Sequence, residues 1–188
     1  KMIDDSVVIS RIGLVEKSGG KIDFVTYLER PLKAAVLVLS DSISAGKKSD
    51  ESGKIIVERL KKEGIDVLHC DILSDDMEAI EKRLIELADV EKVDLVLTTG
   101  GTGFSPRDNT PEATLKVIER QIYGIPEAIR AYGQDRTPYS MLSRAVAGIR
   151  GNTIIINLPG SRKGVRESLD MLFPALFHSF KMLWMGGH

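Results

Sequence analysis

Three aspartates and a glycine-rich stretch are the parts of this chain whose residue types and spacing could do chemistry. The stretch Thr98-Thr99-Gly100-Gly101-Thr102-Gly103 ends an apolar run and leads into a charged turn that contains Asp108. Glycines leave backbone N–H groups accessible and permit positive φ, so a phosphate or a planar ring could lie against this stretch. A tight turn is the alternative, and the stretch forms neither the Walker pattern nor the dinucleotide fingerprint.

A second stretch, Asn157-Leu158-Pro159-Gly160-Ser161, has a similar setting. It ends an apolar run and precedes a helical pattern, so its backbone amides and Ser161 could hold an anion at a helix N-terminus. A capped helix start that binds nothing is the alternative.

The aspartates Asp41, Asp75 and Asp108 each come just after an expected strand end. Carboxylates beside a phosphate-binding loop would suit Mg²⁺, which takes oxygen ligands from proteins and from substrate phosphates together. Other roles stay open. Asp75 or Asp76 could cap the next helix, and Asp108 could pair with Arg107 or cap its own turn.

The remaining reactive side chains give no catalytic pattern. No Ser/His/Asp triad is evident, and His69, His178 and His188 are expected to be structural or solvated. We expect the single cysteine, Cys70, to be a small buried apolar residue and not a nucleophile. One cysteine also excludes an internal disulfide and offers no metal-ligand cluster.

The elements that must position these residues alternate between strands and helices from residue 34 onward. Continuous apolar runs predict strands at 34–40, 65–70, 93–99 and 153–158. Residues 140–147 are expected to form a helical turn and then an edge strand, followed by a turn at 148–151. Helical patterns predict five helices. The first follows Gly53 and ends at Gly64, the second covers 77–88, and the third begins at Pro111 after a Thr110 cap. The last two cover 126–134 and 163–182, the latter with a kink at Pro174.

This alternation predicts a three-layer α/β/α sandwich with a mainly parallel sheet. Right-handed crossovers then bring the carboxyl ends of the strands to one rim. The rim would collect the segments 40–42, 74–76, 98–103 and 157–161, which are rich in small, hydroxyl or acidic residues.

Composition excludes several classes of function. Among 188 residues, 26 are basic and 27 acidic, so electrostatics gives no case for a nucleic-acid or membrane partner. No stretch approaches the roughly 18–20 apolar residues needed to span a bilayer, and no secretory signal is recognisable. We therefore expect a cytoplasmic protein.

Residues 1–32 differ in their sequence pattern from residues 33–188 and are expected to form a hairpin-like extension. Apolar runs at 7–9, 12–15 and 24–28 flank the turn Lys17-Ser18-Gly19-Gly20-Lys21. About thirty residues cannot bury a core of their own. The extension must pack on the main domain, pair with another chain, or be the end of something larger.

Several motifs in the same order and spacing resemble the MogA/MoaB family of molybdenum-cofactor biosynthesis. The resemblance runs from about residue 34 to the C-terminus. Its motifs are Ser40-Asp41, Leu73-Ser74-Asp75-Asp76, the run 98–103, Arg107-Asp108, Thr110-Pro111-Glu112-Ala113, Leu142-Ser143-Arg144-Ala145 and Asn157-Leu158-Pro159-Gly160-Ser161. The Asn-Leu-Pro-Gly form is more similar to the active molybdopterin adenylyltransferase branch than to a silent one.

The resemblance implies that the terminal phosphate of molybdopterin attacks the α-phosphate of ATP, releasing pyrophosphate, with Mg²⁺ assisting. Asp75 and Asp108 fall on the two family aspartates implicated in catalysis and are the candidate metal ligands. The expected substrate-binding residues are Ser40, Asp41, Thr99, Gly100, Gly101, Thr102, Gly103, Ser143, Asn157, Pro159, Gly160 and Ser161. Implied partners are further copies in a homotrimer (or hexamer) and a downstream molybdate-insertion protein.

The extension resembles a different family, the C-terminal tail of MoaC, the cyclic pyranopterin monophosphate synthase. Lys1 and Lys17 fall at lysines of that family's active-site region, and the likeness ends after Lys21, where Ile22-Asp23 replaces the usual Ser-Gly. One hypothesis is that the gene encodes a MoaC–MogA fusion or a relic of one.

Two other functions compete with the adenylyltransferase. One is a catalytically silent, pterin-binding scaffold of the MoaB type. The other is a nucleotide hydrolase related to the CinA family, against which Arg107-Asp108 and the Thr-Pro-Glu-Ala run argue.

Overall fold

The computed structural model describes residues 30–47 and 49–185, and these form one six-stranded sheet with helices on both faces. The strands are β1 (Lys33–Leu39), β2 (Asp66–Leu73), β3 (Leu95–Thr99), β4 (Arg120–Gln121), β5 (Ala147–Arg150) and β6 (Thr153–Leu158). The helices are α1 (Asp41–Ser44), α2 (Ser52–Lys62), α3 (Met77–Ile85), α4 (Thr110–Val117), α5 (Gly124–Gln134) and α6 (Arg162–Met185). A π-helical turn, η1 (Glu86–Val90), extends α3, and a 3₁₀ turn, η2 (Pro138–Leu142), follows α5.

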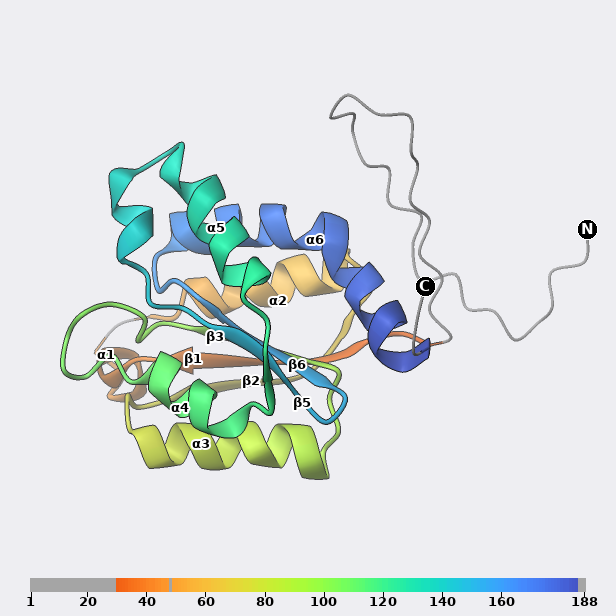
Figure 1. Cartoon of the computed structure of the whole chain (residues 1–188). Coiled ribbons are helices and arrows are strands. Elements are labelled where there is room, and N and C mark those ends of the chain that lie inside the picture. The colour runs from red at the N-terminus through yellow and green to blue at the C-terminus, as the bar shows by residue number, and fades with distance from the viewer. Residues whose placement is uncertain (1–29, 48, 186–188) are drawn as a thin grey trace, which may run out of the picture.

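The sheet has the order β2-β1-β3-β6-β5-β4, and its first four strands are parallel. Figure 1 shows α2, α5 and α6 over one face and α3 and α4 over the other. The predicted three-layer α/β/α sandwich with a mainly parallel sheet is confirmed. Residues 1–29 of the predicted extension, which carry its likeness to MoaC and the lysines Lys1, Lys17 and Lys21, lie outside the described residues.

The buried central strands supply both halves of the core. Alternate residues of β1 point to opposite faces, as the pleat requires. Ala34, Val36 and Val38 join the apolar cluster under α2, α5 and α6. Ala35, Leu37 and Leu39 join the cluster under α3 and α4. A strand buried on both faces explains why the sequence shows a continuous apolar run there.

At the antiparallel edge one expectation is wrong and one strand was not predicted. Residues 148–150, expected as a turn, belong to β5, which pairs with β6 through a two-residue turn at Gly151 and Asn152. Gly151 has a φ of 54°, which suits this tight reversal. The two-residue strand β4, which pairs with β5, has too few residues to show a periodicity.

The helix caps differ from expectation at one position. The residue before α4 is Asn109 and not Thr110, and its side chain makes no capping bond. Thr110 lies inside the helix, fully buried, where its hydroxyl donates to the Gly100 carbonyl at 2.9 Å. Helix α6 continues through position 174 as a single helix, and Figure 1 shows its second half bending away from the direction of the first.

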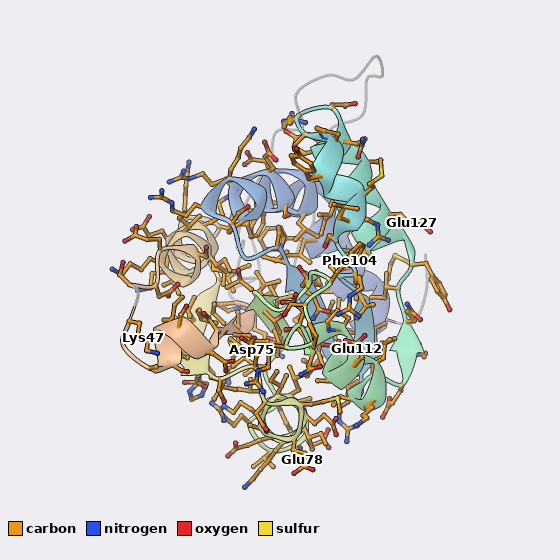
Figure 2. All side chains as sticks on the ribbon, turned by 90° about the vertical axis from the view of Figure 1, so that its left-hand side faces the viewer. Lys47, Asp75, Glu78, Phe104, Glu112 and Glu127 are labelled. Carbon is orange, nitrogen blue, oxygen red and sulfur yellow. The ribbon has the colours of Figure 1, made fainter. Side chains whose placement is uncertain are left out.

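The carboxyl ends of the parallel strands lie together at the left of Figure 1 and face the viewer in Figure 2. The register of the parallel strands brings these ends together: Leu39 lies beside Leu73, Val38 beside Thr99, and Thr99 beside Leu158. We call the loops that follow these four strand ends the rim: residues 40–46, 74–76, 100–109 and 159–161.

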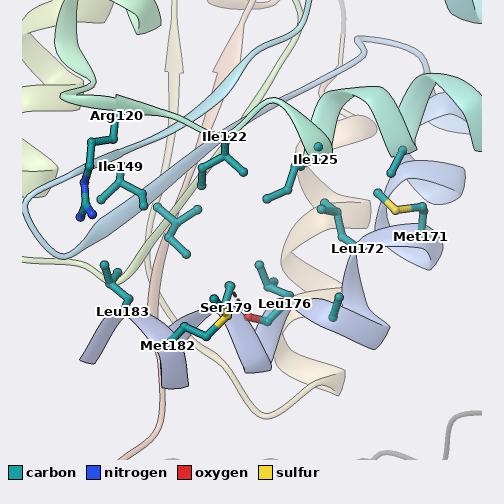
Figure 3. A pocket seen from close by; sticks show the side chains of 14 residues that line it. Arg120, Ile122, Ile125, Ile149, Met171, Leu172, Leu176, Ser179, Met182 and Leu183 are labelled. Atoms are coloured by element: carbon teal, nitrogen blue, oxygen red, sulfur yellow. Dashed lines mark hydrogen bonds between the residues drawn. The ribbon is translucent and has the colours of Figure 1, made fainter. Parts of the chain in front are cut away.

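A pocket of about 530 Å³ lies elsewhere, between α5, α6 and the antiparallel edge of the sheet. Figure 3 shows Ile122, Ile125, Leu176 and Leu183 turned into it. Its lining is apolar apart from Arg120 and Ser179. Among residues 30–47 and 49–185, no helix combines the length and apolarity needed to cross a membrane.

Candidate active site

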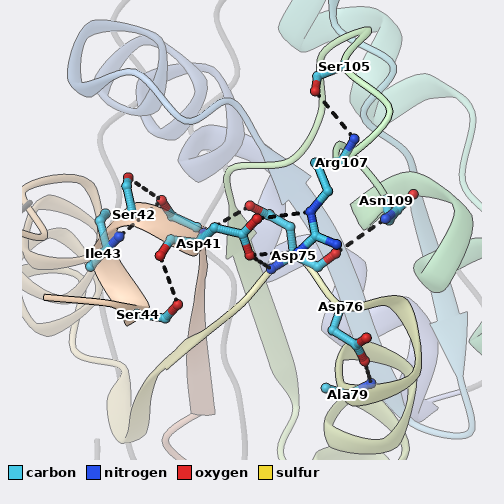
Figure 4. Close-up of polar contacts among 11 residues, drawn as sticks. Asp41, Ser42, Ile43, Ser44, Asp75, Asp76, Ala79, Ser105, Arg107 and Asn109 are labelled. Carbon is cyan, nitrogen blue, oxygen red and sulfur yellow. Dashed lines mark hydrogen bonds and ion pairs between the residues drawn. The ribbon is translucent and has the colours of Figure 1, made fainter. Parts of the chain in front are cut away.

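Asp41 and Asp75 join the first two loops of the rim through a reciprocal pair of hydrogen bonds. The Asp41 N–H donates to Asp75 Oδ2 at 3.0 Å, and the Asp75 N–H donates to Asp41 Oδ1 at 3.0 Å (Figure 4). Each carboxylate therefore fixes the backbone of the other loop. The expected convergence of these two aspartates is present in the structure.

Arg107 brings the third loop onto this pair; it belongs to the Arg107-Asp108 motif, but it is not among the expected site residues. Its Nε lies 2.9 Å from Asp41 Oδ2 and its Nη2 lies 2.8 Å from Asp41 Oδ1, a bidentate fork (Figure 4). The Arg107 guanidinium lowers the pKa of the Asp41 carboxyl below its ordinary value. Asp41 is thus held ionised by a neighbour 66 residues away.

Asp75 has the opposite electrostatic setting. Burial raises the pKa of its carboxyl, and the charges of Asp41 and Asp108 add to the rise. Its Oδ1 is buried and has no hydrogen-bond partner. A buried carboxylate oxygen without a partner is costly, so it marks a position where a cation, a proton or a ligand would be stabilised.

The alternative that Asp75 caps the following helix is wrong. The cap of α3 is Asp76, whose Oδ1 accepts from the Ala79 N–H at 2.8 Å. Asn109 adds a further tie, because its amide donates to the Asp75 carbonyl at 3.2 Å. Asp75 is therefore fixed in the rim and its Oδ1 stays unused.

The glycine stretch runs directly against these side chains. Gly100 and Gly101 have φ values of 101° and 62°, which favour glycine. A Cβ on Gly101 would lie 2.3 Å from Thr110 Oγ1 and 3.2 Å from Asp75 Oδ1. A side chain at this position would fill the space in front of the unpartnered oxygen.

Asp108 closes its own turn, which is one of the alternatives left open by the sequence. Its Oδ2 accepts from the Ser105 N–H at 2.7 Å, and its own N–H donates to the Ser105 carbonyl at 2.9 Å. The pairing partner of Arg107 is Asp41 instead. A Cβ on Gly103 would lie 2.9 Å from Asp108 Oδ2, so this carboxylate also lies against the glycine stretch.

Arg144 holds the segment from Gly103 to Asp108 in place, and it is a further residue that is not among the expected site residues although it lies in one of the motifs. Its guanidinium donates to the Gly103 carbonyl at 2.6 Å, to the Asp108 carbonyl, and to the Glu112 carboxylate. The neighbouring Ser143, an expected substrate contact, uses its hydroxyl to accept from the Ala145 N–H at 3.4 Å. The available signal is the Ser-Arg-Ala run itself, in which the arginine makes the contacts with the loop.

The fourth loop is tied to the glycine stretch. The Thr99 hydroxyl donates to the Pro159 carbonyl at 2.8 Å, and the Ser52 hydroxyl donates to the Gly160 carbonyl at 2.9 Å. A Cβ on Gly160 would lie 3.3 Å from the Gly100 Cα, so the two loops touch through glycines. Ser161 Oγ accepts from the Gly164 N–H at 3.1 Å, which is the capped helix start that the sequence left open.

Asn157 is buried and not open to a ligand. Its amide nitrogen donates to Thr98 Oγ1 at 3.0 Å and to Thr114 Oγ1 at 2.9 Å, and its oxygen accepts from the Val146 N–H at 3.2 Å. Thr102 is also buried, and Ser40 Oγ caps α1 by accepting from the Ile43 N–H. These side chains shape the rim from within.

The histidine and cysteine expectations have different outcomes. His69 lies on β2 and pairs with Glu91. Cys70 is exposed on β2, so the expectation that it is buried is wrong: β2 is an edge strand and its outer side chains lack a covering helix. Desolvation raises the pKa of the Cys70 thiol, with the Asp50 and Asp71 charges adding to it, which disfavours a reactive thiolate.

Comparison with known proteins places this arrangement in a family. Residues 35–178 match the family model described as "Probable molybdopterin binding domain". A molybdopterin adenylyltransferase of Helicobacter pylori (strain J99) is 46% identical over 143 residues, covering 75% of this chain and 81% of the relative.

A molybdenum cofactor biosynthesis bifunctional protein of Chlorobaculum tepidum is 38% identical over 188 residues, all of this chain. This chain spans only 59% of that relative's length. Among solved structures, MoaB of Thermus thermophilus superposes with a TM-score of 0.77 at 41% identity, covering 81% of this chain and 96% of that chain. The Mog protein of Mycobacterium ulcerans gives a TM-score of 0.77 at 38% identity, covering 81% and 99%.

Proposed function

Because the chain belongs to the family of probable molybdopterin binding domains, we propose that it is a molybdopterin adenylyltransferase of molybdenum cofactor biosynthesis. Relatives at 38–46% identity carry that name. The observation that carries the proposal is the meeting of both candidate aspartates with the glycine stretch. A Cβ on Gly101 would contact the Asp75 carboxylate, and one on Gly103 the Asp108 carboxylate.

In the proposed reaction, a molybdopterin phosphate oxygen attacks the α-phosphorus of ATP, a new P–O bond forms, and pyrophosphate leaves. A phosphate is already nucleophilic, so the protein needs no activated serine, cysteine or histidine. Its task is to bring two anions together in line and to offset their repulsion. The glycine backbone and the 159–161 loop would provide N–H groups, and the buried Asn157 and Thr99 would hold those loops in register.

Mg²⁺ fits the donor set that the described residues offer. Among them no group of three or more His, Cys, Asp or Glu side chains forms a ready metal site. Asp75 nevertheless has a buried oxygen without a partner, and Mg²⁺ is commonly held by one or two carboxylates together with substrate phosphates. Asp75 and Asp108 are the proposed ligands, and the ion would neutralise charge on the triphosphate.

The assay is direct: the protein is incubated with molybdopterin, ATP and MgCl₂, and adenylylated molybdopterin and pyrophosphate are measured. We expect the wild type to form both, and Asp108→Ala to be at least about 10²-fold slower, the scale of a lost electrostatic contact. Product formation by Asp108→Ala at the wild-type rate would refute the mechanism. A wild type that binds molybdopterin without turnover would instead indicate the silent scaffold.

The remaining assignments follow the family likeness and have their own tests. We propose a homotrimer, with a hexamer as the alternative, which light scattering after size-exclusion chromatography would distinguish. A downstream molybdate-insertion protein is the proposed partner, and a cytoplasmic location stays a prediction. The match of all 188 residues to a bifunctional relative supports residues 1–32 as the end of a preceding domain.

A further inference from the structure

Arg107 is the rim residue whose contacts the proposed reaction does not yet explain. Its guanidinium binds Asp41 in a bidentate fork, while its side chain is 59% exposed. An exposed ion pair contributes little to stability, so this pairing is easily exchanged for another. Its backbone, in contrast, lies in the turn that Asp108 and Ser105 close with hydrogen bonds.

The position of Arg107 matters because the rim is acidic. Asp41 and Asp75 exchange backbone hydrogen bonds, and the charges of both Asp41 and Asp108 act on Asp75. The charge of Arg107 acts in the opposite sense on both Asp41 and Asp75. If that charge were removed, the two adjoining carboxylates would form a more negative setting, which is the kind that attracts a divalent cation.

A bound triphosphate would change this balance. It adds several negative charges beside the carboxylates, and they must be offset by a metal ion, by basic side chains or by both. A guanidinium fork matches a phosphate as well as it matches a carboxylate, with two parallel N–H···O bonds in each case. Arg107 therefore has two chemically equivalent partners, one in the protein and one in the proposed nucleotide.

We propose that Arg107 stands in for the metal ion at the Asp41–Asp75 pair in the free protein and transfers to a nucleotide phosphate when metal and nucleotide bind. This rests on the proposed function for the identity of the nucleotide. The exchange frees the Asp41 carboxylate, whose negative charge would then add to that of the proposed ligands Asp75 and Asp108 when the ion binds. It also makes metal binding depend on the nucleotide, because the free protein already carries a cation at that place.

The first test uses the metal alone and needs no turnover. Binding of Mn²⁺ to the free protein is measured by electron paramagnetic resonance for the wild type and for Arg107→Ala. We expect Arg107→Ala to bind Mn²⁺ at least about tenfold more tightly, because removing a cation near two carboxylates removes its repulsion of the metal. The double variant Asp41→Asn/Arg107→Ala should lose this gain.

A matched control exists near the other end of β6, away from the rim. Arg150 makes the same bidentate fork with Asp89, at 2.9 Å and 2.6 Å. Arg150→Ala should leave Mn²⁺ binding unchanged. If Arg107→Ala binds Mn²⁺ no more tightly than the wild type while its circular dichroism is unaltered, Arg107 only secures the loop and the proposal is wrong.

The second test examines the transfer to phosphate. In the adenylylation assay, Arg107→Ala should raise the KM for MgATP about tenfold, and Arg107→Lys, which keeps a point charge, should recover part of it. Tighter Mn²⁺ binding with an unchanged KM would overturn the transfer. A wild type without adenylylation activity would refute the proposed function, and the Mn²⁺ result would still decide whether Arg107 takes the place of the ion.

Discussion

The rim and the pocket between α5 and α6 are opposite kinds of surface. The pocket has a volume of about 530 Å³, within the range of small-molecule sites, and an almost wholly apolar lining. The rim has carboxylates, glycines and an arginine from separate loops, tied together by hydrogen bonds. Both regions use β6: the pocket contacts Ile154 near its start, and the rim follows Leu158 at its end.

This difference shows that the volume of a cavity and the chemistry of the side chains around it are separate indicators of a functional site. The pocket can bury apolar surface but has few groups that could hold phosphate. The rim instead holds the Asp75 carboxylate in an unfavourable electrostatic setting that a ligand would relieve. Polar groups kept in such settings are typical of functional sites. The comparison predicts that substitutions of the rim carboxylates change activity more than stability, that substitutions of the rim glycines change stability, and that those at the pocket leave activity alone.

Asp75→Asn should have the largest effect. Activity is expected to fall by about 10²-fold or more, because the carboxylate charge is lost while the bond from the Asp41 N–H remains possible. Stability at neutral pH should rise, since burial raises the pKa of Asp75 and the ionised form is disfavoured in the folded state. Product formation and thermal melting of both proteins would measure the two effects.

The sign of the stability change follows from linkage. The folded state binds a proton on Asp75 more readily than the unfolded state does, so ionised Asp75 lowers stability above its folded pKa. As pH falls through that raised pKa, the wild type protonates and the advantage of Asp75→Asn should disappear. Asp76→Asn is the matched control, because asparagine caps a helix as well as aspartate. A stability gain that persists at low pH would contradict the assignment.

Gly101→Ala should have the next largest effect. Positive φ disfavours any side chain, and the new Cβ would meet Thr110 Oγ1 at 2.3 Å. We expect a loss of about 2–4 kcal/mol in the free energy of unfolding, combining backbone strain with overpacking. Denaturant titration would measure the loss.

Gly46→Ala separates these two causes. Gly46 has a φ of 69°, but its Cβ would meet nothing within 4 Å. Gly46→Ala should lower the free energy of unfolding through backbone strain alone, by about 1–2 kcal/mol. Equal losses at the two glycines would show that the space beside Asp75 is not closely packed.

Met182→Gln should have the smallest effect. Met182 lines the pocket and is 46% exposed, so the change should alter stability by no more than about 0.5 kcal/mol. The KM for ATP and the turnover rate should stay within about twofold of wild type. A large rise in that KM would indicate that the nucleotide binds in the pocket and not at the rim.

The sequence predicts most clearly the features that depend on neighbours along the chain. The buried runs of β1, β3 and β6, the glycines and the acidic strand ends are all visible as local patterns. The residues of β5 indicate a turn by themselves, because Gly148 and Gly151 favour one, but pairing with β6 outweighs that preference. Sequence spacing also could not decide between Asp75 and Asp76, since adjacent aspartates are equally good caps.

Arg107 and Arg144 show why part of the site stays hidden. Arg107 contacts Asp41, 66 residues away, and Arg144 contacts the Gly103 carbonyl, 41 residues away. Neither partner can be found from spacing, because a guanidinium can pair with any of the many carboxylates and carbonyls of the chain. Only the fold selects which of them lies within reach.

The hydrogen bonds of Asn157 have a consequence for the order in which the molecule assembles. One buried amide links β6 to Thr98, 59 residues earlier, and to Thr114, 43 residues earlier. A nascent chain that has released the residues up to α4 from the ribosome therefore holds every carboxylate of the rim but not the strand that fixes the loops. We expect nucleotide binding to appear only after β6 has emerged and paired.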